Sequence, residues 1–132
     1  MNSFQGAITH IQTSGNLTMV IVTIKGNVSI KAVLIDTPKT AAYLVLGREV
    51  TLMFKETEVV LATKVGALSI DNELNGRITA MENGALLSRI CLSTSAGEVV
   101  AVISTDAARK LALTVGKEAT AMIKLNEVIL AP

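Results

Sequence analysis

Short runs rich in apolar and β-branched residues alternate with glycine-containing turns along the whole chain, and this pattern predicts β-strands. In the first half the runs cover residues 7–12, 17–24, 28–35, 48–55 and 58–62. In the second half they cover residues 77–81, 86–93, 99–103, 118–124 and 127–130. Turns such as Lys25-Gly26-Asn27 and Asn83-Gly84 separate them. Five short strands in each half are typical of a small barrel.

One short helix is expected in each half, between the third and fourth strands. In the first half, Asp36-Thr37-Pro38 offers a capping side chain followed by proline in the first turn. This helix is expected to run to about Val45 and to end before Gly47. Its counterpart begins at Ser104-Thr105-Asp106 and ends before Gly116. The predicted fold class is therefore all-β with one short helix per half.

The two halves are copies of one unit. Residues 32–62 align with residues 101–131 without a gap, and twelve of these thirty-one positions are identical, among them Gly47/Gly116 and Lys55/Lys124. The beginnings of the halves also match after a one-residue shift. We therefore expect two repeats, at residues 1–63 and 69–132, joined by a linker at 64–68. Duplication predicts two equivalent sites, or one site where the copies meet.

The composition predicts an aliphatic core and association between chains. Half of the residues are hydrophobic, yet Phe4, Tyr43 and Phe54 are the only aromatic ones. A repeat of this size is near the lower limit for an independent core. The run 17–24 is apolar on both faces, so its second face must meet either the other repeat or a neighbouring molecule. We infer an oligomer.

Charge and hydropathy argue against several classes of partner. The formal net charge is +1, without the basic excess of nucleic-acid-binding domains. A single-stranded nucleic-acid binder would also need aromatic stacking platforms, which this chain lacks. The longest apolar run has eight residues, far short of a membrane span, and the N-terminus has no signal-peptide pattern. We expect a cytoplasmic protein with no nucleic-acid or membrane partner.

Residues suited to catalysis or metal binding are sparse. His10 is the single histidine, and Ala80 occupies its place in the second repeat. Cys91, the single cysteine, lies in a strand pattern and is expected to be buried and inert. No Ser/His/Asp set occurs in both repeats, and no cluster of metal ligands converges. The chain is expected not to be an enzyme.

Lys55 and Lys124 are the strongest candidates for chemistry, because each ends an apolar strand just before a short turn. One interpretation is a lysine that protects a strand end from aggregation. The other is a cation directed at an anion that hydroxyls and amides at a helix start also hold. A hydrogen bond to a charged group contributes about 1.5–3 kcal/mol, so a few such contacts would give micromolar affinity, about −8 kcal/mol.

The order of these motifs, occurring twice, resembles the molybdenum-pterin-binding (Mop or TOBE) domain, and the whole chain resembles a tandem molbindin. The second repeat carries the resemblance best, in Leu74–Ile78, Ala101–Ser104, Leu111–Gly116, Ala119–Lys124 and Val128–Ala131. The resemblance implies two OB-like five-stranded barrels in tandem and assembly into a homotrimer. It also implies molybdate or tungstate bound at domain and subunit interfaces, for storage or homeostasis, without catalysis or an organic cofactor.

The resemblance further implies which residues contact the oxyanion. They are the two lysines, Lys55 and Lys124; residues ahead of the first strand of each repeat, Asn2, Ser69 and Asn72; and hydroxyls at the helix starts, Thr37, Ser104 and Thr105. Three positions depart from the family pattern. Asp71 stands where the family has arginine, and Glu56 and Leu125 follow the lysines where a small polar residue is expected.

These departures leave an alternative open. A carboxylate about 5 Å from a dianion, at an effective dielectric constant of ~20, costs about 6 kcal/mol. Asp71 would therefore oppose binding unless it points away or pairs with Arg77 or Arg109. The alternative hypothesis is an interaction or regulatory module of the same fold that has lost or altered its oxyanion site.

Overall fold

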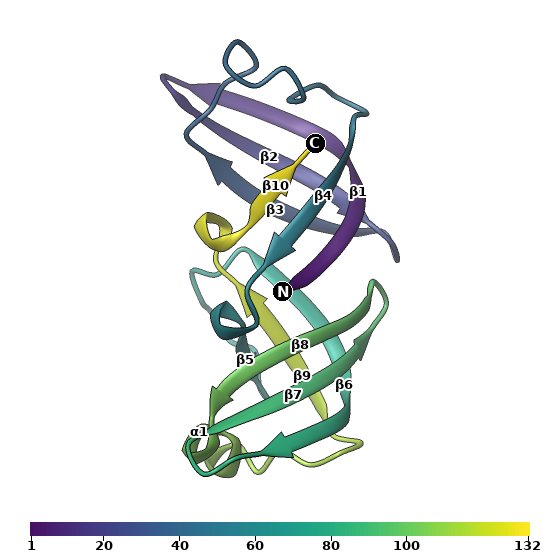
Figure 1. Ribbon diagram of the computed structural model, residues 1–132, viewed down its shortest axis with the longest axis vertical. Helices are drawn as coiled ribbons and strands as arrows, with labels where there is room; N and C mark the ends of the chain where they lie inside the picture. The colour runs from purple at the N-terminus through teal and green to yellow at the C-terminus, as the bar shows by residue number, and fades with distance from the viewer.

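A computed structural model describes residues 1–132 and confirms the predicted fold class. The first repeat contributes β1 (Asn2–Ser14), β2 (Leu17–Ile24), β3 (Val28–Leu34), β4 (Glu49–Phe54), the 3-10 turn η1 (Glu56–Glu58) and β5 (Val60–Ala62). The second contributes β6 (Asn72–Asn83), β7 (Leu87–Thr94), β8 (Gly97–Ser104), α1 (Thr105–Lys110), β9 (Glu118–Ile123), η2 (Leu125–Glu127) and β10 (Ile129–Ala131). The two units are stacked along the long axis of the molecule (Figure 1).

The two repeats exchange their last strands. One sheet has the order β10-β4-β1-β2-β3, and the other has the order β5-β9-β6-β7-β8. Thus β10 of the second repeat pairs with β4, with Leu130 opposite Leu52, and β5 of the first repeat pairs with β9, with Leu61 opposite Ala121. Each sheet has five strands, as expected, but the sheets do not follow the repeat boundaries 1–63 and 69–132.

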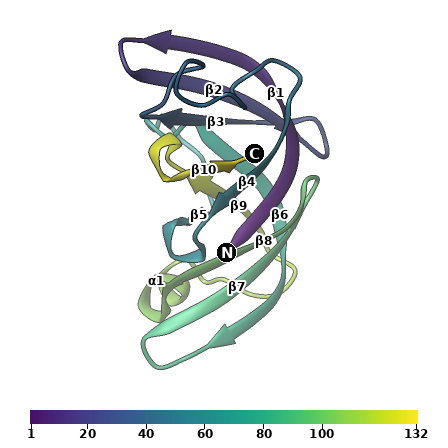
Figure 2. The same ribbon diagram turned by 45° about the horizontal axis from the view of Figure 1, so that its top comes forward.

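Short 3-10 turns carry the chain from one sheet to the other. Only η1 and its flanking residues separate β4 from β5, and η2 separates β9 from β10 in the same way. At each of these turns the chain crosses to the neighbouring sheet instead of folding back as a hairpin onto its own. Both termini consequently lie near the middle of the molecule, between the two units (Figure 2).

The long strands β1 and β6 curve so that each pairs with two neighbours. Each contains a register shift, between Ile8 and His10 in β1 and between Ile78 and Ala80 in β6. Upstream of each shift lies a glycine at a close approach. A Cβ on Gly6 would lie 2.6 Å from the carbonyl oxygen of Thr23, so only glycine fits there. Bulges and such glycines bend strands and allow small sheets to close.

A single aliphatic core runs through both units. Its 28 buried residues come from both repeats, so neither repeat has a core of its own. Phe4 stacks on Phe54 with ring centroids 5.9 Å apart, and Gly97 of the second repeat lies against Phe4. No helix in the structure has the length and apolar character needed to cross a membrane.

The apolar strand β2 is only partly covered within one chain. Val20, Val22 and Ile24 are buried, whereas Leu17 is exposed and Met19 and Ile21 are half-buried. The second repeat therefore does not bury the outer face of this strand. Of the two alternatives from the sequence, contact with a neighbouring molecule remains as the prediction.

The prediction of a helix from Asp36 to Val45 is wrong. The prediction of a helix in the second repeat is confirmed by α1. In the first repeat only isolated turns form, such as the one in which the Ala41 N–H donates to the carbonyl oxygen of Thr37 at 2.8 Å. The Thr40 hydroxyl accepts from the Thr37 N–H at 2.8 Å and donates to Asp36 at 3.2 Å. Side chain–backbone bonds of this kind compete with helix formation, and β-branched residues disfavour it. The segment Ala107–Lys110 contains better helix formers.

Gly26→Ala is expected to destabilise the protein by about 2 kcal/mol or more, measured by chemical denaturation. Gly26 has φ +80°, and a Cβ there would lie 2.5 Å from the carbonyl oxygen of Ser95, in the β7–β8 turn of the other repeat. Gly15→Ala is the control, because Gly15 has φ +62° with nothing within 4 Å. Equal losses for the two variants would contradict a tight contact between the hairpin tips.

Candidate functional site

The two predicted lysines lie at equivalent junctions between the repeats. Lys55 precedes η1, which packs on β8, and Lys124 precedes η2, which packs on β3. We call these junctions the first seam and the second seam. The backbone at the two lysines is nearly identical, with φ −69° and ψ 143° at Lys55 and φ −67° and ψ 146° at Lys124. Both side chains are exposed, so the strand exchange presents one accessible cation at each seam.

Asn2 and Asn72 clamp the seams. The side chain of Asn72 accepts from the Lys31 N–H at 2.7 Å and donates to the Lys31 carbonyl oxygen at 2.9 Å. Asn2 makes the same pair of bonds, both 2.8 Å, to the backbone of Val100. Both asparagines are buried, and each satisfies an edge strand of the other repeat. Their predicted contact with an anion stays a prediction, because the structure shows their polar atoms bonded to backbone.

The two carboxylates that the sequence places near the lysines are both paired with cations. Asp71 is 3.2 Å from the Lys31 ammonium, rather than paired with Arg77 or Arg109 as the sequence suggested. Glu56 is 3.3 Å from the N-terminal amine and 3.9 Å from Arg89. Sequence reasoning missed Lys31 and Arg89, since Lys31 lies 40 residues from Asp71 along the chain.

The predicted hydroxyls lie at the other ends of the sheets. Thr105 is buried, donates to the Gly84 carbonyl oxygen at 2.8 Å and shares a bond with Ser88 at 2.9 Å. Ser104 caps α1 by accepting from the Ala107 N–H at 3.0 Å. In Figure 1, α1 lies at the lower end of the molecule, far from the turn that follows β9.

One chain therefore does not bring the lysines and these hydroxyls together. Asn72 pairs with Ile123, next to Lys124, whereas Thr105 shares a hollow with Asn83 at the opposite end of β6. At about 3.3 Å per residue, the two ends of the 12-residue strand β6 are roughly 36 Å apart along the strand. Thr37 is likewise at the far end of β1, beside Thr13. Ser69 is exposed just ahead of β6, at the lysine end.

The remaining candidates for chemistry do not form a site. Cys91 is buried, as expected, and its sulfur accepts from Arg89 at 3.3 Å. His10 is exposed on β1. No group of three or more His, Cys, Asp or Glu side chains could hold a metal ion.

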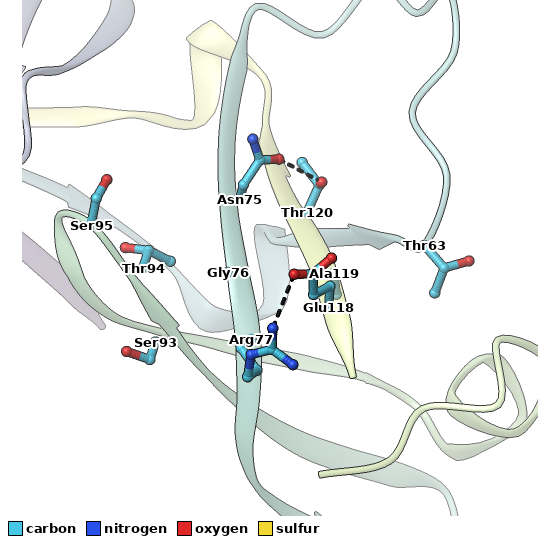
Figure 3. Close-up of a pocket in the computed structure, with 10 residues that line it drawn as sticks. All are labelled: Thr63, Asn75, Gly76, Arg77, Ser93, Thr94, Ser95, Glu118, Ala119 and Thr120. Atoms are coloured by element: carbon cyan, nitrogen blue, oxygen red, sulfur yellow. Dashed lines mark hydrogen bonds and ion pairs between the residues drawn. The ribbon is translucent and has the colours of Figure 1, made fainter. Parts of the chain in front are cut away.

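The largest hollow is a polar groove over β6, β7 and β9, with a volume of about 530 Å³ (Figure 3). Arg77 is its single cation, and it is bonded to Glu118 at 3.0 Å and to the Gly116 carbonyl oxygen at 2.6 Å. Asn75 and Thr120 bond to each other across the groove at 2.8 Å. The groove contains none of the predicted residues, and its only cation is neutralised, so it offers no net charge to a dianion.

Comparisons of the chain with known proteins point to one family. The TOBE domain model matches residues 68–130. A probable molybdenum-pterin-binding protein of Haemophilus influenzae is 35% identical over 63 residues, which span 91% of that protein and 47% of this chain. The chain belongs to the molybdenum-pterin-binding protein family.

Longer relatives show that the tandem arrangement is shared. The molybdenum transport protein ModE of Herbaspirillum seropedicae is 33% identical over 133 residues, which span 98% of this chain and 49% of that protein. The chain thus spans about half the length of this relative. The molybdenum-pterin-binding protein MopB of Rhodobacter capsulatus is 37% identical over 103 residues, which span 72% of this chain and 37% of MopB.

One solved structure resembles this chain over almost its whole length. The cytoplasmic molybdate-binding protein ModG, with molybdate bound, has a TM-score of 0.92 and 28% sequence identity, and the match covers 98% of this chain and 94% of ModG. Both units and their relative placement are therefore alike in the two proteins. The resemblance to a tandem Mop protein is confirmed.

Asn2→Ala is expected to lower the free energy of unfolding by about 2–4 kcal/mol, because it leaves the buried N–H and carbonyl groups of Val100 without partners. Denaturant titration would measure the loss. Asn75→Ala is the control, since Asn75 is exposed and accepts one bond from Thr120; it should cost less than about 1 kcal/mol. A loss at Asn2 no larger than at Asn75 would show that the clamp contributes little.

Proposed function

We propose that this protein binds molybdate, or the similar dianion tungstate, reversibly at the seams between its repeats and at interfaces between copies of the chain. The observation that carries the proposal is the equivalent placement of Lys55 and Lys124 at the two strand-exchange seams, in a chain that superimposes on a molybdate-bound relative. An exposed ammonium next to a neutralised carboxylate attracts a dianion without a large opposing charge.

The separation of lysines from hydroxyls supports binding between chains. The hydroxyl-bearing ends expose large apolar side chains: Leu17, Ile35 and Leu46 at one end, and Leu86, Leu87 and Val115 at the other. Leu86 is 82% exposed and Ile35 is 79% exposed, which is costly for a chain that stays alone. Association of copies through these ends buries the apolar residues and completes sites that one chain leaves unfinished. The homotrimer implied by the resemblance is the assembly we propose.

The proposed role is storage and homeostasis of the oxyanion in the cytoplasm, by equilibrium binding without catalysis and without an organic cofactor. Two relatives support this role: ModG is a cytoplasmic molybdate-binding protein, and ModE is a molybdenum transport protein. The residue set supports the binding role as well, since lysine ammonium groups form strong charge-assisted hydrogen bonds with anionic oxygens.

Isothermal titration of the assembled protein with molybdate, tungstate and sulfate tests the proposal, together with light scattering to measure the mass of the assembly. We expect saturable binding of molybdate and tungstate by a trimer. An assembled protein that gives no heat with any of the three anions would favour the alternative, an interaction or regulatory module with an altered site.

Lys124→Met is expected to weaken oxyanion binding at the second seam by roughly 10- to 100-fold, the loss of one charged hydrogen bond. Lys55→Met should do the same at the first seam, so each variant is expected to lose about half of the high-affinity sites in titration. Lys25→Met, at an exposed lysine in the β2–β3 turn, is the control for a change in overall charge. Unchanged affinity and stoichiometry in both seam variants would exclude the lysines from the site.

A further inference from the structure

We propose that Lys31 and Arg89 act as counter-cations that each repeat supplies to the seam carried by the other, and that they keep these seams open to a dianion. The inference rests on the proposed function and assigns the residues that make it compatible with Asp71 and Glu56. At the second seam, Lys31 supplies a positive charge 3.2 Å from the carboxylate of Asp71.

The geometry at the second seam fixes Lys31 in place. Its backbone is held on both sides by Asn72, and its ammonium lies 3.2 Å from Asp71. Lys31 belongs to β3, the strand on which η2 packs directly after Lys124. The side chains of Lys31 and Asp71 are 37% and 30% exposed, so the pair can be reached by an ion from solvent.

At the first seam, the carboxylate of Glu56 also lies near a cation of the other repeat, but this cation is Arg89. Arg89, on β7, lies 3.9 Å from Glu56 and donates to the sulfur of Cys91 at 3.3 Å, which orients its guanidinium. The sheet registers place Met19 at the position equivalent to Arg89, and Val100 at the position equivalent to Lys31. The two cations therefore do not descend from one position of the duplicated unit. Asp71 is thus paired with a cation of the other repeat, whereas Glu56 is shared between Arg89 of the other repeat and the N-terminal amine of its own repeat, which lies at 3.3 Å.

If these ion pairs had a purely structural role, removing one of them would have little measurable effect on the protein. Half-exposed surface pairs contribute little to stability, so Lys31→Met should leave the melting temperature within about 2 °C of the wild type. The affinity for the anion should fall strongly in the same variant, because an unpaired Asp71 repels a dianion over several ångströms. Lys31 thus acts through Asp71, whose negative charge it masks.

Three variants of the full chain separate these effects in molybdate titrations. Lys31→Met leaves Asp71 unmasked and should weaken the second-seam site about tenfold or more. Asp71→Asn frees the Lys31 charge and should tighten that site severalfold. The double variant Lys31→Met/Asp71→Asn removes both charges and should return the affinity close to that of the wild type. All three effects should shrink at high salt.

Two further variants test whether the change in molybdate affinity arises at the second seam. Lys25→Met changes an exposed lysine in the β2–β3 turn of the same repeat and should leave affinity unchanged. Arg89→Met should weaken the first-seam site and spare the second, the reverse of Lys31→Met.

The outcomes are distinct. If the wild type binds molybdate and Lys31→Met binds it equally well, or if Asp71→Asn weakens binding, the inference is overturned while the proposed function stands. If the wild type does not bind, the proposed function fails and the inference falls with it. Weakening by Lys31→Met that the second substitution reverses supports masking of Asp71.

Discussion

The exchange of the last strands, β5 into the second sheet and β10 into the first, is the constraint on which the rest of this structure depends. Neither repeat can complete its five-stranded sheet alone, so the core forms as one body of buried residues drawn from both. The short 3-10 turns that carry the chain between sheets are also the places where Lys55 and Lys124 sit. The same connection thus builds the fold and presents the two cations.

Holding two curved sheets in register needs more than the exchanged strands. The clamps of Asn2 on Val100 and of Asn72 on Lys31 satisfy edge-strand groups that would otherwise lack partners. They fix the edge strands β8 and β3 against the first residues of β1 and β6 in the other repeat. Polar groups placed in this way contribute mainly through specificity of alignment, because a misplaced sheet would leave them buried and unsatisfied.

Both seams carry ion pairs that join the two repeats. Asp71 and Glu56 would repel an oxyanion if they stood alone, but each lies near a cation from the opposite repeat, and Glu56 is also paired with the N-terminal amine of its own repeat. Meanwhile the hydroxyls of Thr37, Ser104 and Thr105 lie at the far ends, next to exposed leucines. Under the proposed function, the lysines at the junction of the units and the hydroxyls at the far ends would meet only when copies of the chain associate.

The sequence by itself determined the duplication, most of the strands, the aliphatic core and the family, because all of these depend on local periodicity and on residue order. It also selected Lys55 and Lys124, since both copies retain them at a strand end. Only the tertiary structure decided which strands pair and which charges meet. Partners such as Lys31 and Asp71 are 40 residues apart, and no local pattern encodes that contact. The missing first helix has a similar cause: hydrogen bonds of Thr40 outweighed a correct capping signal.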